Sequence, residues 1–258
     1  MILVLDVGNT NIEFGLFHNQ KGDFTILSSA RYFTKINITS DELGFFALRF
    51  LEVNGFTRKD INRLVYSSVV PQLNNKIESL FTTYFSGTIV KVSSDIHLGI
   101  KNKYKNPAEV GSDRLVNASL VYHEYKKNAV IVDMGTATTV CGLNADGDYL
   151  GGVIIPGVLT ASQALFDKAA KLPAVSISYK DKVLSDNTIG AIESGIYFSN
   201  FYALQGIMKK LIAELQFDNC LKIATGGYSS IFQKDGLFDI VDDGLSIKGL
   251  KHISDINS

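Results

Sequence analysis

ILVLDVGNTNIEFGLF, residues 2–17, begins with an apolar run that is typical of a buried strand. The polar stretch Asp6–Asn11 then forms a turn, and alternating apolar residues predict a returning strand. Gly8 can adopt a positive φ, and the backbone N–H groups of such a turn can bind an anion. Asp6, at the end of a buried strand, needs a partner such as a hydrated divalent cation that carries phosphates. The alternative is an ordinary hairpin with a surface aspartate.

The same pattern returns in AVIVDMGTATTVCGLN, residues 129–144, 127 positions further along the chain. At this constant shift Asp6 falls on Asp133 and Gly15 falls on Gly142. The spacing predicts a duplicated domain, with each half opening on the same hairpin. Two such hairpins facing across a cleft would hold the phosphates of a nucleotide from both sides. A chance match between short strands is the alternative.

Bulk properties limit the class of protein. The 258 residues allow two domains, and a hydrophobic fraction of 46% is ordinary for a globular protein. A net charge of −1 gives no reason to expect nucleic-acid or membrane partners. No apolar run approaches the ~20 residues that span a bilayer, and the N-terminus lacks the basic region of a signal peptide. Two cysteines, Cys141 and Cys220, fit a reduced environment, so we expect a cytoplasmic protein.

Periodicity predicts the other elements. In the first half we expect strands at 24–33, 61–70 and 88–93 and helices at 40–54 and 72–86. In the second half we expect helices at 115–127, 158–171, 188–215 and 244–254, strands at 149–155, 220–224 and 237–241, a loop at 173–187 and a mobile tail at 255–258. The order βββαβαβ indicates an α/β, duplicated ribonuclease-H-like fold of the actin, Hsp70 and sugar-kinase type. It would comprise two domains, 1–114 and 115–258, and a central cleft.

A second group of polar residues, Gly111-Ser112-Asp113-Arg114, ends the polar connection 97–114. A carboxylate can accept the proton of an attacking hydroxyl, and an arginine can bind a carboxylate or phosphate through two parallel bonds. The alternative is a solvated ion pair in which Asp113 caps the helix predicted at 115–127.

Seven motifs occur in a characteristic order: DVGNTNIEFGLF (6–17), SSVVP (67–71), NPAEVGSDRLVNA (106–118), VDMGTATTVCGL (132–143), GGVIIPG (151–157), TIGAIESGI (188–196) and TGG (225–227). Together they resemble type III pantothenate kinase, the family also called Bvg accessory factor, over nearly the whole chain. Two departures are minor and should preserve the backbone geometry. Ser112 stands where alanine is common, and Val110 stands where leucine is common.

The resemblance implies ATP-dependent phosphorylation of pantothenate to 4′-phosphopantothenate, the first step of coenzyme A biosynthesis. It implies that ATP and its Mg²⁺ bind at Asp6, Val7, Gly8, Asn9, Thr10, Asn11, Ile12 and Glu13, with a further ATP contact at Thr136. It implies Asp113 as general base and Tyr104, Gly111, Ser112, Asp113, Arg114 and Thr188 as the pantothenate site. Asp133 would bind a monovalent cation, K⁺ or NH₄⁺. The family forms homodimers, for which the helix at 189–213 would supply an apolar face; core burial explains that face equally well.

Two other functions remain open at this stage. The first is another phosphotransferase of the same fold, similar to exopolyphosphatase or acetate kinase, which would lack the substrate loop with Tyr104 and Gly111–Arg114. The second is a non-enzymatic nucleotide-sensing regulator. A regulator would not need both Asp113 and Asp133, and the balanced charge gives no DNA-binding patch.

Overall fold

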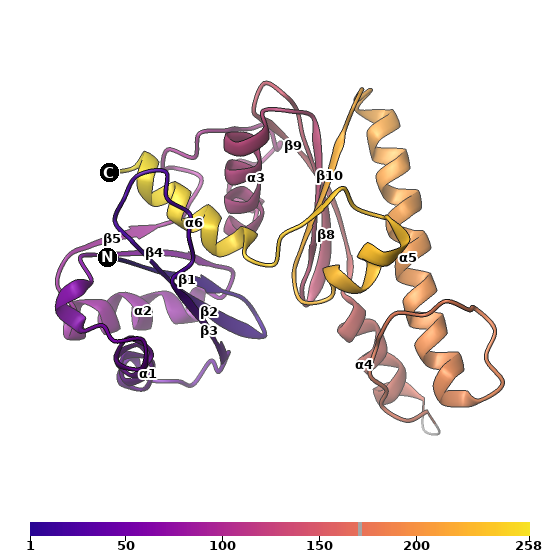
Figure 1. Ribbon diagram of the computed structural model, residues 1–258, viewed down its shortest axis with the longest axis horizontal. Coiled ribbons are helices and arrows are strands. Elements are labelled where there is room, and N and C mark those ends of the chain that lie inside the picture. Colours follow the sequence, from indigo (N-terminus) through magenta and orange to yellow (C-terminus); the bar gives the residue numbers. More distant parts are fainter. Residues whose placement is uncertain (170–171) are drawn as a thin grey trace. The chain divides into compact units, whose positions relative to one another are not determined.

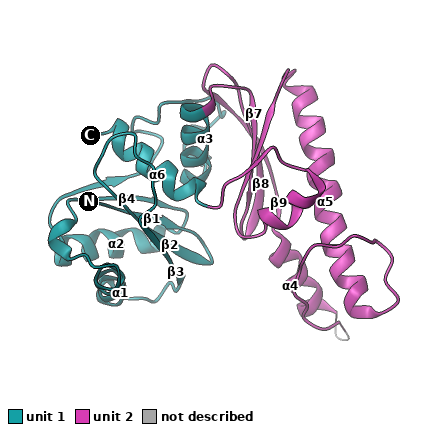
Figure 2. Ribbon diagram, viewed as in Figure 1, with its two compact units in different colours: residues 1–124, 244–258 teal, residues 125–243 magenta. Residues whose placement is uncertain are grey.

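The elements of the chain form two compact units, residues 1–124 with 244–258 and residues 125–243 (Figure 2). The computed structural model describes residues 1–169 and 172–258 (Figure 1). Residues 115–124 and 244–258, which the sequence prediction assigned to the second domain, lie in the first unit. Each unit carries one hairpin of the predicted duplication on its own sheet.

The first unit is built on a five-stranded sheet in the order β3-β2-β1-β4-β5. Its strands are β1 (Ile2–Val7), β2 (Asn11–Phe17), β3 (Ser28–Phe33), β4 (Arg63–Ser68) and β5 (Thr88–Lys91), and its helices are α1 (Ser40–Val53), α2 (Pro71–Tyr84), α3 (Ser112–Tyr125, of which residue 125 falls in the second unit) and α6 (Leu245–Ile256). The central strand β1 runs antiparallel to β2 and parallel to β4. Helices cover both faces of the sheet, which explains the unbroken apolar run of β1.

The side chains of β1 alternate between two packed faces. Leu3, Leu5 and Val7 join a hydrophobic cluster with residues of α1 and α2. On the opposite face, Val4 and Ile247 of α6 both approach the backbone of β2. The helix α6 therefore covers this second face of the sheet that contains β1.

The second unit has strands in the order β11-β10-β7-β8-β9. They are β7 (Ala129–Met134), β8 (Ala137–Leu143), β9 (Asp148–Pro156), β10 (Leu221–Thr225) and β11 (Ile240–Val241), and the helices are α4 (Val158–Lys168) and α5 (Thr188–Glu214). A hydrophobic cluster joins β7, β8 and β10 to α5 and the 3₁₀ helix Ser229–Asp235. Among the described residues, no helix is both long and apolar enough to cross a membrane.

Most predicted elements are present, with shifted ends. The helix predicted at 115–127 begins three residues earlier, at Ser112, and the strand predicted at 237–241 is only Ile240–Val241. The sequence did not predict the strand β6 (Lys101–Asn102) or the 3₁₀ helices Arg58–Asp60, Pro107–Glu109 and Ser229–Asp235. The helix predicted at 158–171 ends at Lys168, and the prediction for 170 and 171 lies outside the described residues.

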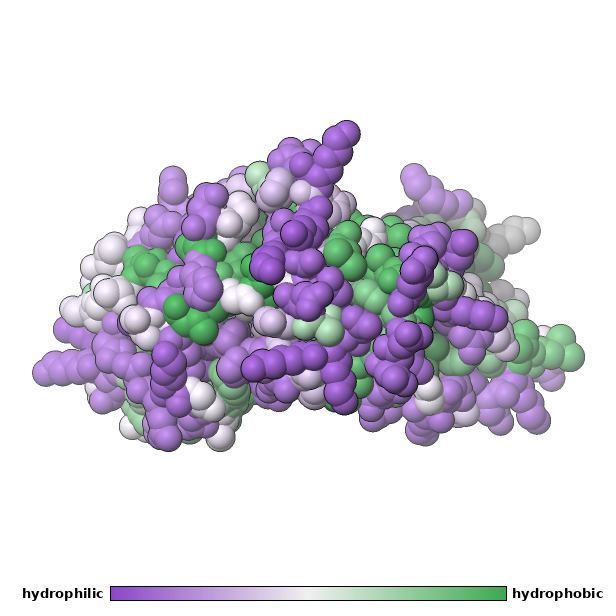
Figure 3. Space-filling view, turned by 90° about the horizontal axis from the view of Figure 1, so that it is seen from above, coloured by the Kyte–Doolittle hydropathy of each residue, from purple (hydrophilic) through white to green (hydrophobic). Residues whose placement is uncertain are grey.

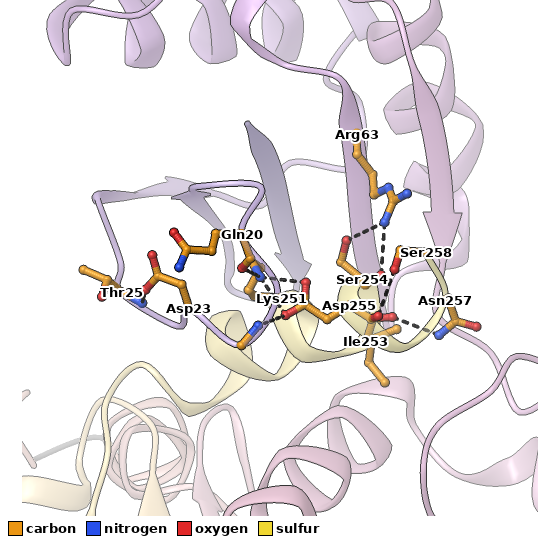
Figure 4. A network of polar contacts seen from close by, with 11 residues as sticks. Gln20, Asp23, Thr25, Arg63, Lys251, Ile253, Ser254, Asp255, Asn257 and Ser258 are labelled. Carbon is orange, nitrogen blue, oxygen red and sulfur yellow. Dashed lines mark hydrogen bonds and ion pairs between the residues drawn. The ribbon is translucent and has the colours of Figure 1, made fainter.

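The prediction of a mobile tail at 255–258 is wrong for its first two residues, because Ile256 and Asp255 belong to α6 and Asp255 is buried. Its carboxylate accepts two bonds of 2.7 Å from the ammonium of Lys251, which is fully buried, and one of 3.0 Å from Gly22 N–H (Figure 4). Lys251 also donates to the carbonyl of Gln20 at 2.9 Å. A buried ammonium needs such a partner, and the pair ties α6 to the loop between β2 and β3.

The two hairpins have identical patterns of burial along both strands. Three residues separate β1 from β2, whereas only two separate β7 from β8. Gly15 consequently lies opposite Val4, but the residue opposite the equivalent Ile131 is Cys141. Matching Gly15 with Gly142 at a constant shift is therefore wrong by one position in the second strand.

Candidate active site

The first turn, between β1 and β2, is held in place by its own backbone and by the residue that follows β3. Gly8 N–H donates to the carbonyl of Asn11 at 2.9 Å. Thr34 donates its hydroxyl to the carbonyl of Gly8 at 2.7 Å and its N–H to the carbonyl of Thr10 at 2.9 Å. Gly8 is not among the residues with positive φ, so its flexibility is not used as the sequence suggested. These three bonds hold the backbone of the turn in place.

In the predicted ATP stretch, Asn9 and Asn11 are exposed in or beside the turn, and the side chains of the flanking strands divide into two sets. Val7 and Ile12 are fully buried in the cluster with α1 and α2, so only their backbones remain available for a phosphate. Asp6 and Glu13 are half-buried and lie opposite each other on neighbouring strands, on one face of the sheet. Glu13 also accepts a bond of 3.3 Å from Arg31 of β3. The turn thus presents carboxylates beside backbone amides.

Ser112–Arg114 form the start of α3, directly after Gly111, and not a loop before the helix. Asp113 is the second residue of the helix, so it is not the residue before the helix that a cap would require. Its carboxylate accepts the N–H of Arg114 at 2.8 Å. A side chain on Gly111 would come within 2.4 Å of that carboxylate, so Asp113 would have to move.

Burial controls the acidity of Asp113. Removal from water raises the pKa of its carboxyl above the ordinary value, while the N–H and the charge of Arg114 act in the opposite direction. A carboxylate whose pKa is raised accepts a proton from an alcohol more readily than an ordinary one. The general-base role of Asp113 stays a prediction.

Arg114 and Tyr104 lie together. The guanidinium carbon of Arg114 is 5.9 Å from the centre of the Tyr104 ring, within the range of a cation–π contact. The arginine side chain is buried, and Tyr104 is half-buried with its N–H bonded to the side-chain oxygen of Asn102 at 3.0 Å. This pair fits the recognition of a carboxylate on a small substrate.

The end of β4 connects the two groups. Ser67 is in register with Asp6 on the neighbouring parallel strand, and its hydroxyl oxygen is 3.0 Å from that of Ser112. The structure therefore brings the first turn and the start of α3 to one edge of the first sheet. The sequence prediction quoted SSVVP as a motif but gave Ser67 no role, since register cannot be read from the motif itself.

In the second unit, Asp133 is half-buried at the end of β7, and Thr136 is exposed in the turn after it. Asp133 is in register with Thr139 and Thr225 on the two neighbouring strands. The carbonyl of Thr136 accepts bonds from Gly157 N–H at 3.1 Å and from the Thr160 hydroxyl at 2.6 Å. The start of α4 thus packs directly against this turn.

Thr188 is the exposed first residue of α5. The helix is capped by its neighbour Asn187, whose side chain accepts the N–H of Gly190 at 2.9 Å. A capping role therefore does not explain Thr188. Its role in substrate binding stays a prediction, as do the predicted cation site at Asp133 and the central cleft.

The two sheets, each opening on the same hairpin, define a duplicated ribonuclease-H-like fold of the actin and sugar-kinase class. A solved structure of that class is the Listeria monocytogenes Lmo2764 protein, which is named as an N-acetylmannosamine kinase. It matches with a TM-score of 0.56 at 12% identity and covers 100% of this chain and 99% of its own. A Campylobacter jejuni protein, named as a Baf family transcriptional activator, matches with a TM-score of 0.63 at 18% identity, covering 99% and 98%. At these identities the likeness shows the fold alone.

The particular family follows from the sequence comparison. The chain belongs to the type III pantothenate kinase family, whose model matches residues 2–210. A type III pantothenate kinase from Dehalococcoides mccartyi is 35% identical over 257 residues, which are 99% of this chain and 96% of the relative. The predicted family is confirmed, and with it a kinase function in coenzyme A biosynthesis. Every predicted site residue lies within the matched range.

Proposed function

We propose that the protein transfers the γ-phosphoryl group of ATP to the primary alcohol of pantothenate and releases ADP and 4′-phosphopantothenate. The observation that carries this proposal is the half-buried Asp113 at the start of α3, next to Arg114 and linked through β4 to the turn that carries Asp6. Phosphoryl transfer depends mainly on positioning and on neutralising charge. The first unit thus offers a base (Asp113), a positively charged side chain (Arg114) and a turn for phosphate binding at one edge of its sheet.

Asp113 accepts the proton of the pantothenate hydroxyl as the oxygen attacks the phosphorus atom. Arg114, stacked near Tyr104, holds the carboxylate of pantothenate at the opposite end of that substrate. Gly111 and Ser112 supply the adjoining backbone, and Thr188 supplies a further hydroxyl. The hydroxyl of Ser112 itself points to β4.

The ATP site comprises Asp6–Glu13 and Thr136. The backbone amides of the first turn bind phosphate oxygens, and Asp6 and Glu13 supply the carboxylate oxygens that suit Mg²⁺. When bound, Mg²⁺ neutralises charge on the β- and γ-phosphates. Asp133, flanked in register by the hydroxyl-bearing Thr139 and Thr225, provides an oxygen-rich place for K⁺ or NH₄⁺.

We also propose a cytoplasmic homodimer. The second unit leaves large apolar side chains at its surface, and Figure 3 shows hydrophobic residues between hydrophilic ones on the face that it draws. Ile154, Leu159, Phe166, Ile189 and Tyr202 are 46–62% exposed. Exposed apolar residues of this size in β9, α4 and α5 suit the core of an interface between two copies. Sedimentation equilibrium should give twice the chain mass, and a monomer would contradict the dimer.

A steady-state assay tests the function. The protein is incubated with ATP, Mg²⁺ and pantothenate, with K⁺ or with Na⁺ alone, and 4′-phosphopantothenate is measured by mass spectrometry. Turnover that requires pantothenate and K⁺ or NH₄⁺ is expected. Activity on sugars, acetate or polyphosphate but not pantothenate would favour another phosphotransferase. ATP binding without turnover on any acceptor would favour a regulator.

A further inference from the structure

The strand β4 extends beyond the end of its pairing with β5, toward the candidate active site. β5 pairs with β4 only from Arg63 to Tyr66, and the last ladder bond on that side runs from Val92 N–H to the carbonyl of Tyr66 at 2.8 Å. The other edge of β4 stays bonded to β1, where Val69 N–H donates to the carbonyl of Val7 at 3.0 Å. Ser68 therefore has one backbone edge that no strand covers, and such groups need partners.

Ser112 takes the place of the missing strand. The N–H of Ser68 donates to the Ser112 hydroxyl oxygen at 3.2 Å, and that hydroxyl lies 3.3 Å from the carbonyl of Ser68. The hydroxyl of Ser67, which is 1% exposed, is 3.0 Å from the same oxygen. One side chain at the start of α3 thus meets three polar groups of β4.

Only one arrangement of hydrogens satisfies all three contacts. A serine hydroxyl donates one bond and accepts two. If Ser112 donates to the carbonyl of Ser68, its oxygen accepts both the N–H of Ser68 and the hydroxyl of Ser67. Every hydrogen-bonding capacity of the Ser112 side chain is then used, so α3 is fixed to β4 at this point.

This contact lies between the two acids of the proposed mechanism. Ser67 is in register with Asp6, so the side chains of these two residues share one face of the sheet. Ser112 directly precedes Asp113. The proposed phosphate turn and the proposed base are therefore connected by the register between β1 and β4 and by the contact between two serine hydroxyls, without a flexible loop between them.

We propose that Ser67 and Ser112 form a positioning pair that sets where the carboxylate of Asp113 lies relative to the turn that carries Asp6. The proposal rests on the proposed function, because it assigns these serines to the transfer step. Neither serine touches the reacting atoms. Their hydroxyls hold the first turn of α3, and so the base, against the strand that is registered with the phosphate site.

The test compares Ser112→Ala with a matched control. Ser119→Ala removes another serine hydroxyl of α3, buried and bonded to the carbonyl of Leu98 at 2.5 Å, away from β4. Ser112→Ala and Ser67→Ala should each lower kcat about tenfold, since small displacements of a catalytic group are costly. The KM values for ATP and pantothenate should stay within about twofold. Ser119→Ala should keep kcat, and Ser112→Thr, which retains the hydroxyl, should restore most of it.

A double variant separates positioning from general stability. If Ser112 acts through Asp113, Ser112→Ala should have no further effect on kcat in an Asp113→Asn background. A tenfold loss in that background as well, or a kcat for Ser112→Ala equal to that of Ser119→Ala, would overturn the proposal. Should Ser112→Ala fail to fold, Ser67→Ala supplies the same comparison.

Hydrogen exchange separates this proposal from the proposed function. The N–H groups of Arg114 and Leu115 donate to the carbonyl of Gly111, so loss of the Ser112 hydroxyl should speed their exchange several-fold, and Ser119→Ala should not. An inactive wild-type protein would refute pantothenate phosphorylation and leave this measurement valid. Unchanged exchange in Ser112→Ala would refute the positioning pair even if the wild type is active.

Discussion

The two hairpins share the same strands but differ in what packs against their turns. The first turn has three residues and lies beside Thr34 and the end of β4, through which it is linked to α3. The second turn has two residues and lies against the start of α4. Thr160 of that helix and Gly157, which directly precedes it, donate hydrogen bonds to the carbonyl of Thr136 in the turn. A duplicated strand pair therefore does not imply a duplicated chemistry. The neighbours of each turn decide what it can do.

The largest expected effect tests whether Asp113, which is linked to the first hairpin through Ser112 and Ser67, is the base. Asp113→Asn should lower kcat by roughly 10²–10⁴, because the amide cannot accept a proton. Since burial raises the pKa of Asp113, the wild-type rate should fall with acid at a higher pH than an ordinary carboxyl predicts.

Steady-state kinetics and the thermal midpoint of Asp113→Asn are measured on one preparation. A lowered midpoint with unchanged kcat would remove Asp113 from catalysis. Arg114→Ala serves as the companion variant and should mainly raise the KM for pantothenate while retaining part of kcat.

The next effect compares the equivalent acids Asp6 and Asp133. Asp6→Asn should lower kcat about 10²-fold, because it removes charge from the proposed Mg²⁺–phosphate site. Asp133→Asn should raise the KM for ATP roughly tenfold, as expected for one lost charge interaction of about 1.4 kcal/mol, and should abolish the response to K⁺. Titrations with ATP and with K⁺ measure both. Identical profiles for the two variants would mean that the turns are equivalent after all.

A smaller effect concerns glycines near the turns. A methyl group at Gly157 would collide with the carbonyls of Gly135 and Thr136, whereas one at Gly8 would lie 3.2 Å from the carbonyl of Asn11. Gly157→Ala should therefore destabilise the protein by about 1–3 kcal/mol, and Gly8→Ala by clearly less. Chemical unfolding measures both free energies. Equal losses of unfolding free energy in the two variants would show that the second turn accommodates a methyl group as well as the first does.

The smallest effect uses pH to compare the units, because all four histidines lie in the first. Burial and the nearby His123, whose ring centre is 4.3 Å away, lower the pKa of His252 to about 4. Its unfolded pKa is about 6.5, so the unfolded chain binds the proton more tightly. The stability that neutral His252 contributes is complete above that value and is lost as the pH falls toward 4.

Other charges also face His252: Asp255 raises its pKa, while Lys251 and His97 lower it. Hydrogen exchange at pH 7 and pH 4.5 should show the first unit loosening more than the second. A His252→Asn variant should lose less stability with acid than the wild type does. An equal loss in both proteins would assign the acid sensitivity to other groups.

Local patterns were enough to predict most strands and helices. The apolar run before Asp6, its repeat before Asp133 and the helical spacing in 40–54 each reflect burial of one face or of both, which the side chains themselves report. The predicted candidate residues Asp113, Arg114 and Tyr104 also lie together. Element ends were less well predicted: α3 begins at Ser112, whose hydroxyl contacts β4, a segment more than forty residues earlier in the chain.

The sequence by itself determined the fold class, the family and the identity of the candidate acids, because those depend on residue types at fixed spacing. Only the tertiary structure decided that Ser67 stands beside Asp6, that α6 returns to the first sheet, and that the second turn is one residue shorter than the first. These features depend on strand register and on packing between segments far apart in the chain. The buried pair of Lys251 and Asp255 illustrates why the sequence does not reveal such packing. The carboxylate of Asp255 also accepts a bond from Gly22, more than two hundred residues away along the chain.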